Sequence, residues 1–168
     1  MHIILREEES ADVDAIARLT RLAFADMEYS SHTEQFIVHA LRRAGQLSLS
    51  LVAVDGEKLV GHVAFSPVDI SLAAGDWYGL GPVSVLPDWQ GQGVGSRLIL
   101  DGLARLRAMG SAGCVLVGDP AYYRRFGFRA WPGLATPGVP PVYFLALPFG
   151  EDRPLGEAVF HPAFEAVC

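Results

Sequence analysis

The order of polar and apolar residues along the chain predicts a mixture of strands and helices. Residues 2–5 are mostly apolar, which is typical of a short strand. Apolar residues then recur at helical spacing in two stretches, and we expect one face of each helix to be buried. The positions expected on these faces are Val13, Ile16, Thr20, Ala23 and Phe24 in the first helix, and Phe36, Ile37, Ala40, Leu41 and Ala44 in the second.

Residues typical of helix ends support both helices. Ser10 is expected to cap the first helix, and Asp12 and Asp14 fall in its first turn, where the helix dipole favours negative charge. Residues 31–34 have the Ser-x-x-Glu spacing of a capping box, and Gly45 stands where a helix commonly ends. Two helices are therefore expected before the main sheet.

Strand patterns dominate the next part of the chain. Residues 47–54 and 59–70 are expected to form a hairpin around a turn at residues 55–56. Residues 77–86 predict a further strand that contains Pro82, and a proline within a strand indicates a bulge or a break in the ladder of hydrogen bonds. We therefore expect this strand to be interrupted.

Helix and strand patterns continue to alternate toward the C-terminus. We expect a helix that ends near Gly110, a buried strand at residues 114–117, a short helix at 120–126 and a final strand at 142–147. Residues 131–141 are rich in proline and glycine and are expected to form a long loop. This order of elements indicates an α+β protein.

Composition fits a single domain. With 51% hydrophobic residues, a chain of this length, residues 1–168, can bury one sizeable core. Charged residues occupy positions 6–9, where a secretory signal would need an apolar run, and no segment approaches the roughly 20 apolar residues of a membrane span. We therefore expect a cytoplasmic protein with no membrane attachment.

The formal net charge is −6 at pH 7. This charge opposes binding to nucleic acid, which relies on a basic surface, and it favours cationic substrates such as amines. It also repels a polyanionic cofactor, so such a cofactor needs local N–H groups and a few placed cations. The candidate cations are Arg97, Arg124 and Arg125.

The cysteines and histidines do not have the spacing of a metal site. Cys114 lies in an apolar run and Cys168 ends the sequence, so both are expected to be free thiols. Histidines are scattered along the chain, and we expect them to have packing or surface roles and to bind no metal. They include His32, His39, His62 and His161.

One segment carries a specific chemical signal. An apolar strand end at residues 83–86 leads through a glycine-rich turn into a helix with apolar residues at helical spacing. Gly91, Gly93 and Gly95 let the backbone approach a ligand closely, and the first turn of a helix presents N–H groups that have no partner within the helix. A phosphate is the expected ligand.

Two familiar phosphate-binding motifs differ from this segment. A nucleoside-triphosphate loop needs Lys followed by Ser or Thr after its last glycine, whereas Gly95 is followed by Ser96 and Arg97, so this interpretation is excluded. A dinucleotide fold has its glycines after an early strand, and an acidic residue about 20 residues further on. Here the glycines lie past the middle of the chain and no acidic residue ends the strand at 114–117, so a dinucleotide site is the weaker interpretation.

The pattern Gln90-x-x-Gly93-x-Gly95, after a V-x-V-x-P strand end, closely resembles the pyrophosphate-binding motif of the GNAT superfamily of acyl-CoA N-acyltransferases. A second segment, residues 118–128, supports this resemblance. Its Y-x-x-x-G-F part begins at Tyr123, and its full wording, G-D-P-x-Y-Y-x-R-F-G-F, is similar to a subgroup of small bacterial GNAT proteins.

The resemblance implies a GNAT-like α+β fold, with a mixed, mostly antiparallel sheet whose central strands splay apart and which is flanked by helices. It implies an N-acetyltransferase that transfers the acetyl group of acetyl-CoA to a primary amine of a small molecule or peptide, by direct attack in a ternary complex. GNAT proteins often dimerise, although no segment here specifies a homodimer. The residues implied to bind the cofactor are Val83, Ser84, Val85, Gln90, Gly91, Gln92, Gly93, Val94, Gly95 and Ser96.

The resemblance also implies roles in the chemistry. Tyr123 would act as the general acid that protonates the departing CoA thiolate, and the N–H of Val85 would stabilise the oxyanion. An alkyl ammonium, with a pKa of about 10.4, must lose a proton before it attacks. The sequence leaves the base open among Glu28, Glu34, Asp76 and water.

One position departs from the family pattern. Many GNAT proteins have an Asn after the strand corresponding to residues 114–117, where it binds the pantetheine arm, whereas this sequence has Asp119 followed by Pro120. That contact is therefore not carried over. The competing interpretation of the chain is a catalytically silent acyl-CoA-binding regulatory module, which the presence of Tyr123 disfavours.

Overall fold

The computed structural model describes residues 2–168, and the chain divides into two compact units. The first unit comprises the residues up to Ser66, Gly81–Gly102 and Pro162–Cys168, and the second comprises Pro67–Leu80 and Leu103–His161. Some elements have residues in both units: they are β3 (Lys58–Ile70), β4 (Trp77–Val85) and α3 (Val94–Ala108).

The first unit is built on antiparallel strands. β1 (Ile3–Glu7) pairs with β2 (Leu49–Asp55), and β2 pairs with the first part of β3. The connection between β2 and β3 is the expected hairpin, in which Gly56 adopts a φ of +61°. The strand near the N-terminus and the hairpin are thus confirmed, with boundaries that differ by one or two residues.

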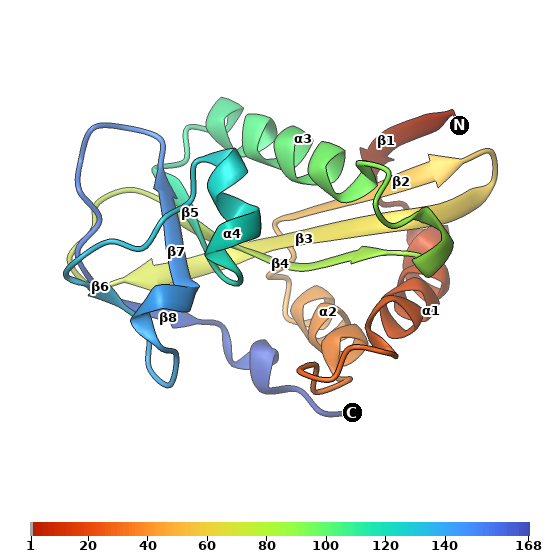
Figure 1. Ribbon diagram of the computed structural model, residues 1–168, viewed down its shortest axis with the longest axis horizontal. Helices are drawn as coiled ribbons and strands as arrows, with labels where there is room; N and C mark the ends of the chain where they lie inside the picture. The colour runs from red at the N-terminus through yellow and green to blue at the C-terminus, as the bar shows by residue number, and fades with distance from the viewer. Residues whose placement is uncertain (1) are drawn as a thin grey trace. The chain divides into compact units, whose positions relative to one another are not determined.

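Two helices, α1 (Val13–Phe24) and α2 (Glu34–Arg43), pack together and cover one face of these strands (Figure 1). Their buried residues form an apolar cluster with β2, whose members are Ile16, Val38, Val52 and Val54. Most of the positions expected on the buried faces are buried or half-buried, and Ala44 is exposed. The periodicity of the sequence therefore predicts these two helix faces well.

The first turns of α3 pack against the opposite face of the same strands. A Cβ added to Gly61 of β3 would lie 2.9 Å from side-chain atoms of both Val94 and Leu98. Gly61 is paired with Ala53 of β2, and neighbouring residues along a strand point to opposite faces. Successive residues of β2 therefore point in turn toward α2 and toward α3.

A charged pair organises the start of α1. Ser10–Asp12 form a short 3-10 helix, η1, ahead of α1. The carboxylate of Asp12 accepts a hydrogen bond from the N–H of Glu9 (2.7 Å) and forms a salt bridge with Arg6 (2.7 Å). The hydrogen bond from Arg6 holds the pKa of Asp12 below its usual value. The Ser10 cap is therefore a wrong prediction, because Glu9 and Asp12 form the cap at the start of η1.

At the start of α2, the residue that contacts Glu34 is Ser30. Its hydroxyl donates to the Glu34 carboxylate (2.7 Å), whereas the hydroxyl of Ser31 lies 2.6 Å from that of Thr33. A bond between side chains 30 and 34 thus replaces the capping box expected at residues 31–34. The helix ends as expected, with Gly45 at a φ of +70°.

The second unit contains both parallel and antiparallel strand pairs. The first part of β4 pairs in parallel with β5 (Gly113–Val117) over Trp77–Gly79, and β5 pairs antiparallel with β7 (Phe144–Pro148). Between β5 and β7 in the chain come α4 (Pro120–Tyr123) and the 3-10 turn η3 (Arg124–Phe126). The splaying of central strands stays a prediction.

The sequence pattern does not predict two strands of the second unit. β8 (Gly156–Phe160) pairs with the end of β3, and the two-residue β6 (Leu134–Ala135) pairs with β8. The expectation that the strand at 142–147 is the last one is therefore wrong. β8 escapes prediction because it is short and begins with Gly and Glu, which are both depleted in strands.

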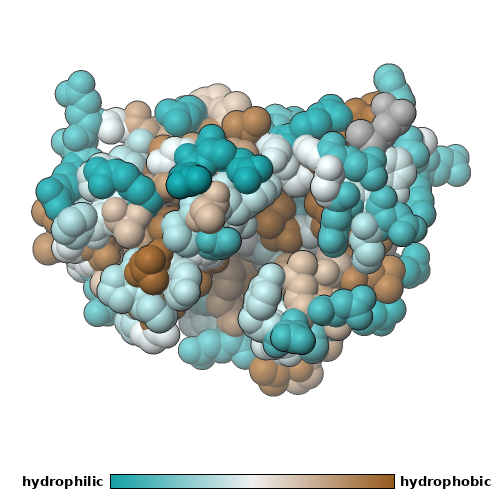
Figure 2. All heavy atoms as spheres, in the orientation of Figure 1, coloured by the Kyte–Doolittle hydropathy of each residue, from teal (hydrophilic) through white to brown (hydrophobic). Residues whose placement is uncertain are grey.

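The second unit also buries an apolar cluster, whose members are Val68, Ile70, Trp77, Val115, Leu134, Phe144, Ala146 and Ala158. On the face drawn in Figure 2, polar side chains cover much of the surface, and apolar ones form separate patches. The α+β class, with a mixed and mostly antiparallel sheet flanked by helices, is confirmed. None of the helices within residues 2–168 has the length and apolar character needed to cross a membrane.

Gly102 of α3 provides a test of the packing against β3. A Cβ at this position would overlap the ring of Phe65. Alanine favours a helix by about 1 kcal/mol over glycine, but overpacking a buried contact costs about 1–3 kcal/mol. We therefore expect Gly102→Ala to lower the free energy of unfolding by about 1 kcal/mol in denaturant titrations.

The control for this substitution is Gly150→Ala. A Cβ at Gly150 meets no other atom within 4 Å, so this variant should unfold at the denaturant concentration of the wild type. Equal midpoints for the two variants would contradict tight packing of α3 on Phe65.

Candidate functional site

The glycine-rich turn adopts a backbone that glycine adopts readily and other residues rarely do. β4 ends at Val85, the 3-10 turn η2 (Pro87–Trp89) follows, and α3 begins at Val94. Gly91 has a φ of +74° and Gly93 a φ of +83°. A Cβ on either residue would meet no atom within 4 Å, so the backbone here borders open space. A ligand can therefore approach the main chain closely.

Gly93 also begins the hydrogen bonding of α3. The N–H of Arg97 donates to the carbonyl of Gly93 (3.0 Å). The N–H groups of Val94 and Gly95 come before this first bond and have no acceptor within the helix. Together with the positive end of the helix dipole, they form a favourable position for an anion.

Two glutamine side chains hold the turn in shape. The carboxamide of Gln90 donates to the carbonyl of Val85 (3.0 Å), and that of Gln92 donates to the carbonyl of Asp88 (3.0 Å). Both bonds tie the turn back to residues that precede it. These two residues of the predicted site therefore contribute to its shape through their side chains.

β4 presents alternate residues to its two edges. β3 and β4 are neighbouring strands joined by only six residues, 71–76, which is too short for a parallel crossover, so they run antiparallel. The N–H of Leu86 donates to the carbonyl of Val60 on β3 (2.9 Å). The N–H and C=O groups of successive residues in a strand point to opposite edges. The N–H and C=O of Ser84 therefore face β3, whereas those of Val83 and Val85 face the other edge.

The three candidate arginines have different surroundings. Arg97, in the same unit as the turn, donates to the carbonyl of Ile3 (3.2 Å). Arg125, in the second unit, donates to the carbonyl of Tyr122 (2.8 Å), and its guanidinium lies 4.3 Å from the centre of the Tyr122 ring. Arg124 is exposed. Of the three, Arg97 is the one that shares a unit with the turn.

Tyr123 ends α4 in the second unit. Asp119 caps this helix by accepting a hydrogen bond from the N–H of Ala121 (2.9 Å), so the residue that departs from the family pattern has a structural role. The ring of Tyr123 packs edge-on against Tyr122, with the ring centres 4.9 Å apart. Burial raises the pKa of the Tyr123 phenol to about 12. The phenol therefore holds its proton at neutral pH.

The candidate bases belong to both units. Glu34, in the first unit, accepts hydrogen bonds from Ser30 (2.8 and 2.7 Å). Glu28 is exposed in the same unit, and Asp76 is exposed just before β4 in the second unit. The described contacts do not single out one of them as the base.

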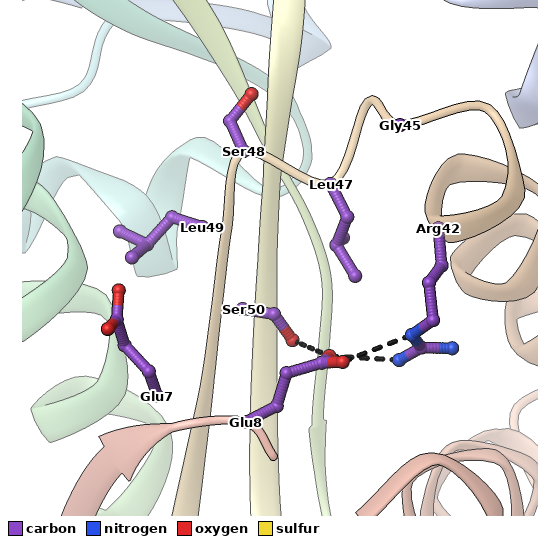
Figure 3. A pocket seen from close by; sticks show the side chains of 8 residues that line it. All are labelled: Glu7, Glu8, Arg42, Gly45, Leu47, Ser48, Leu49 and Ser50. Atoms are coloured by element: carbon purple, nitrogen blue, oxygen red, sulfur yellow. Dashed lines mark hydrogen bonds and ion pairs between the residues drawn. The ribbon is translucent and has the colours of Figure 1, made fainter. Parts of the chain in front are cut away.

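A series of hydrogen-bonded polar residues, which local sequence patterns do not predict, crosses the first unit. Arg42 of α2 makes two hydrogen bonds to the carboxylate of Glu8 (3.0 and 2.9 Å). The hydroxyl of Ser50 on β2 donates to the same carboxylate and lies 2.7 Å from Nε2 of His62 on β3. Figure 3 shows Arg42, Glu8 and Ser50 converging beside a cavity of about 370 Å³.

Only one arrangement of protons satisfies this series of hydrogen bonds. An ionised Glu8 accepts and cannot donate, so the single hydroxyl proton of Ser50 points to Glu8. Ser50 must then accept a hydrogen bond from His62, which places the imidazole proton on Nε2 and leaves Nδ1 as an acceptor. The available signal in the sequence is the presence of Ser50 and His62 within otherwise apolar strands.

The surroundings of these groups support this arrangement. Burial opposes ionisation of Glu8, but hydrogen bonds from Arg42 and Ser50 outweigh it and lower the pKa of the carboxyl. Burial lowers the pKa of His62 to about 4, so its imidazole is neutral at neutral pH. The series of hydrogen bonds thus contains one cation, Arg42, and one anion, Glu8, followed by the neutral Ser50 and His62.

The remaining titratable groups do not build a metal site in the part of the chain that the structure describes. No three side chains of His, Cys, Asp or Glu within residues 2–168 lie where they could hold a metal ion. Cys114 is buried and Cys168 is exposed, and both are free thiols. Burial raises the pKa of the Cys114 thiol, which makes it a poor nucleophile.

Comparison with known proteins relates the chain to acetyltransferases. A family model described as "Acetyltransferase (GNAT) domain" matches residues 5–131. A protein of Escherichia coli K12, named "Uncharacterized N-acetyltransferase YhbS", is 39% identical over 141 residues, which cover 78% of this chain and 81% of that protein.

Two solved structures are similar over nearly the whole chain. A GNAT family acetyltransferase from Brucella melitensis, in complex with acetyl-CoA, is 49% identical with a TM-score of 0.86, and the match covers 97% of this chain and 98% of that one. The YhbS protein of Escherichia coli, in complex with CoA, is 33% identical with a TM-score of 0.89, and the match covers 100% of this chain and 94% of that one.

The buried imidazole of His62 makes the stability of the protein depend on pH. Its pKa is about 4 in the folded state against an ordinary value of 6.5, so between these values the unfolded state binds more protons and stability falls as the pH falls. From pH 7.5 to pH 5 this linkage removes about 2 kcal/mol. We expect urea unfolding of His62→Gln to show a correspondingly smaller loss than the wild type.

An exposed histidine of α2, His39, provides the control. His39→Gln should keep the pH dependence of the wild type. The burial of a neutral His62 would be contradicted if His62→Gln and the wild type lost equal stability over this range.

Proposed function

Because the chain belongs to the GNAT acetyltransferase family, we propose that it transfers the acetyl group of acetyl-CoA to a primary amine that attacks the thioester directly in a ternary complex. The family gives the general activity: the protein is an N-acetyltransferase, and acetyl-CoA is its acyl donor. The proposal adds the acceptor and the residues, and takes residues 1–168 as one domain. The acceptor is an amine of a small molecule or peptide, whose cationic form a chain of net charge −6 attracts.

The turn before α3 is the observation that carries this proposal. Its open backbone at Gly91 and Gly93, and the N–H groups of Val94 and Gly95, suit the diphosphate of CoA. Local N–H groups are needed because the net charge of the chain repels a polyanion at longer range. We therefore assign the diphosphate to residues 90–96.

The part of β4 that follows its pairing with β5 at Trp77–Gly79 suits the rest of the cosubstrate. The N–H and C=O of Val83 face away from β3, so they can pair with the amides of the pantetheine arm as one strand pairs with another. The carbonyl of Val85 is occupied by Gln90, which leaves its N–H as the group that can donate. We assign this N–H to the acetyl carbonyl, whose oxygen gains negative charge during the attack.

The reaction requires two proton movements. The amine loses a proton and its nitrogen bonds to the acetyl carbon; the carbon–sulfur bond then breaks, and the CoA sulfur takes up a proton. The amine's proton passes to a carboxylate, with Glu28, Glu34 and Asp76 as candidates, or to water.

Tyr123 is assigned to the departing sulfur. Its pKa of about 12 is above that of a thiol, about 8.5. The phenol therefore stabilises the thiolate mainly as a hydrogen-bond donor. If its proton passes to the sulfur, a second proton must reach the phenol oxygen at the same time. In this way burial keeps Tyr123 in the protonated form that the step needs.

Release of free thiol from acetyl-CoA, measured with a panel of amines, tests the proposed function. The panel includes a polyamine, an aminoglycoside, an amino acid and a peptide with a free N-terminus. We expect amine-dependent thiol release with at least one of them. Saturable binding of CoA without amine-dependent release from any would instead favour the catalytically silent acyl-CoA-binding regulatory module.

Gly93→Glu is expected to abolish binding of CoA. The new side chain would strain a backbone with a φ of +83° and would place a carboxylate against the diphosphate. Isothermal titration calorimetry should give a dissociation constant raised by a factor of about 100 or more, which corresponds to about 3 kcal/mol.

The matched control is Gly56→Glu in the β2–β3 hairpin. Gly56 also has a positive φ, +61°, and open surroundings, so it receives the same charge and similar strain. It should bind CoA with the affinity of the wild type. Wild-type affinity in Gly93→Glu would rule out the assignment of the diphosphate to residues 90–96.

Tyr123→Phe is expected to reduce kcat by about 10- to 100-fold, because a hydrogen bond to a charged group contributes about 1.5–3 kcal/mol. The affinity for CoA should change little, since the assigned contact forms only as the thiolate departs. Tyr122→Phe, at the neighbouring ring, should retain kcat. Full activity of Tyr123→Phe in the thiol-release assay would remove its assigned role.

A further inference from the structure

Three buried polar atoms of the first unit have no hydrogen-bond partner among the described residues. One is the hydroxyl oxygen of Ser66 on β3, and the other two are Nδ1 of His62 on β3 and the hydroxyl oxygen of Ser84 on β4. His62 is 0% exposed and Ser84 is 2% exposed. Buried polar groups are nearly always hydrogen-bonded, because a group without a partner loses its hydration and gains nothing in return. Each of these atoms therefore requires a partner.

The strand register brings the two side chains to neighbouring positions. The N–H of Leu86 donates to the carbonyl of Val60, which aligns the end of β4 with β3. Regular antiparallel pairing from this bond onward places Ser84 opposite His62. Side chains directly opposite in an antiparallel pair point to the same face, with their Cβ atoms about 4.5–5.5 Å apart. The hydroxyl and the imidazole thus share one face of the sheet.

The two atoms also have complementary chemistry. The bonds through Glu8 and Ser50 place the proton of His62 on Nε2, so Nδ1 can only accept a hydrogen bond. The hydroxyl of Ser84 can donate one. A donor and an acceptor, each buried and each without a partner, therefore lie at facing positions.

We propose that one buried water links the two groups by accepting a hydrogen bond from the hydroxyl of Ser84 and donating one to Nδ1 of His62, and that Ser84 is thereby a positioning residue for acetyl-CoA. The completed series of hydrogen bonds crosses the first unit from α2 to β4, and its members are Arg42, Glu8, Ser50, His62 and Ser84. Its last member stands between Val83 and Val85, to which the proposed function assigns the pantetheine arm and the acetyl carbonyl. This series of hydrogen bonds fixes the position of β4 at Val83 and Val85. Because the contacts of these two residues with acetyl-CoA belong to the proposed function, this inference rests on it.

His62 does not fit the alternative role of general base. A general base works best when its pKa lies near the working pH, whereas burial lowers the pKa of His62 to about 4. The imidazole is also fully buried. An acceptor that stays neutral suits a positioning role, because the hydrogen bond then persists across the working pH range.

Nuclear magnetic resonance of the protein with ¹⁵N-labelled histidine tests the hydrogen bond without any ligand. The two ring nitrogens of a neutral imidazole give well-separated signals according to which of them carries the proton. His62→Gln identifies the signals of this residue. We expect a proton on Nε2 and a bare Nδ1, whose signal moves in Ser84→Ala and stays in place in Ser66→Ala.

Ser66→Ala is a matched control for Ser84→Ala. Ser66 lies four residues after His62 on β3, and its hydroxyl is also buried without a partner, so the two variants lose the same atom from similar surroundings. We expect Ser84→Ala to weaken binding of acetyl-CoA about fivefold, the effect of one hydrogen bond, and Ser66→Ala to stay within about twofold of the wild type. The KM for acetyl-CoA should rise accordingly, with a smaller change in kcat.

The outcomes separate this inference from the proposed function. If the wild type gives no saturable heat with acetyl-CoA, the proposed function fails, and the positioning role fails with it. If the wild type binds but the two serine variants bind equally well, the inference alone is overturned. A proton on Nδ1 of His62, or an Nδ1 signal that does not move in Ser84→Ala, also overturns it.

Discussion

A helix that begins in a left-handed glycine turn leaves amide hydrogens at its start without acceptors, and an anion can satisfy several of them at once. In this protein that helix is α3, and the turn holds Gly91 and Gly93 with open space around them. The net charge of −6 makes this constraint stronger, because the chain has no general attraction for a polyanion. In the proposed function, recognition of CoA therefore depends on a few backbone groups held in one geometry. The side chains of Gln90 and Gln92 contribute to that geometry by bonding to carbonyls that precede the turn.

The same segment of chain connects the turn to the interior of the first unit. β4 ends immediately before η2, and the alternation of its residues presents Val83 and Val85 to one edge and Ser84 to β3. On the side of β3, a line of hydrogen bonds runs from a salt bridge near the surface to the buried imidazole of His62. A buried polar chain of this kind is stable only when each member has a partner, so it also determines which rotamers and which protons are allowed. In the proposed arrangement, the backbone that meets the cosubstrate is supported by side chains that do not touch it.

Local patterns in the sequence predict the parts of the fold that depend on neighbours in the chain. The hairpin at Asp55 and Gly56, the buried faces of α1 and α2, and the turn before α3 all follow from periodicity and from where glycine stands. The parts that depend on distant residues are not predicted. β8 forms because the end of β3, far away in the sequence, offers it a partner.

The polar chain is another long-range feature. Glu8, Ser50 and His62 come from three separate segments, and their proximity follows only from the pairing of β1 with β2 and of β2 with β3. In the sequence, Ser50 and His62 are polar residues within otherwise apolar strands, and Glu8 is one of three consecutive glutamates. Once the register is known, elementary rules for donors and acceptors are enough to assign every proton along the chain.

The most direct test of the account is to follow the backbone amide signals of ¹⁵N-labelled protein while CoA is added. The account predicts that the amides of Gly91, Gly93, Val94 and Gly95 shift progressively and saturate together, because they donate to the diphosphate. Saturable binding that leaves these four signals in place would contradict it.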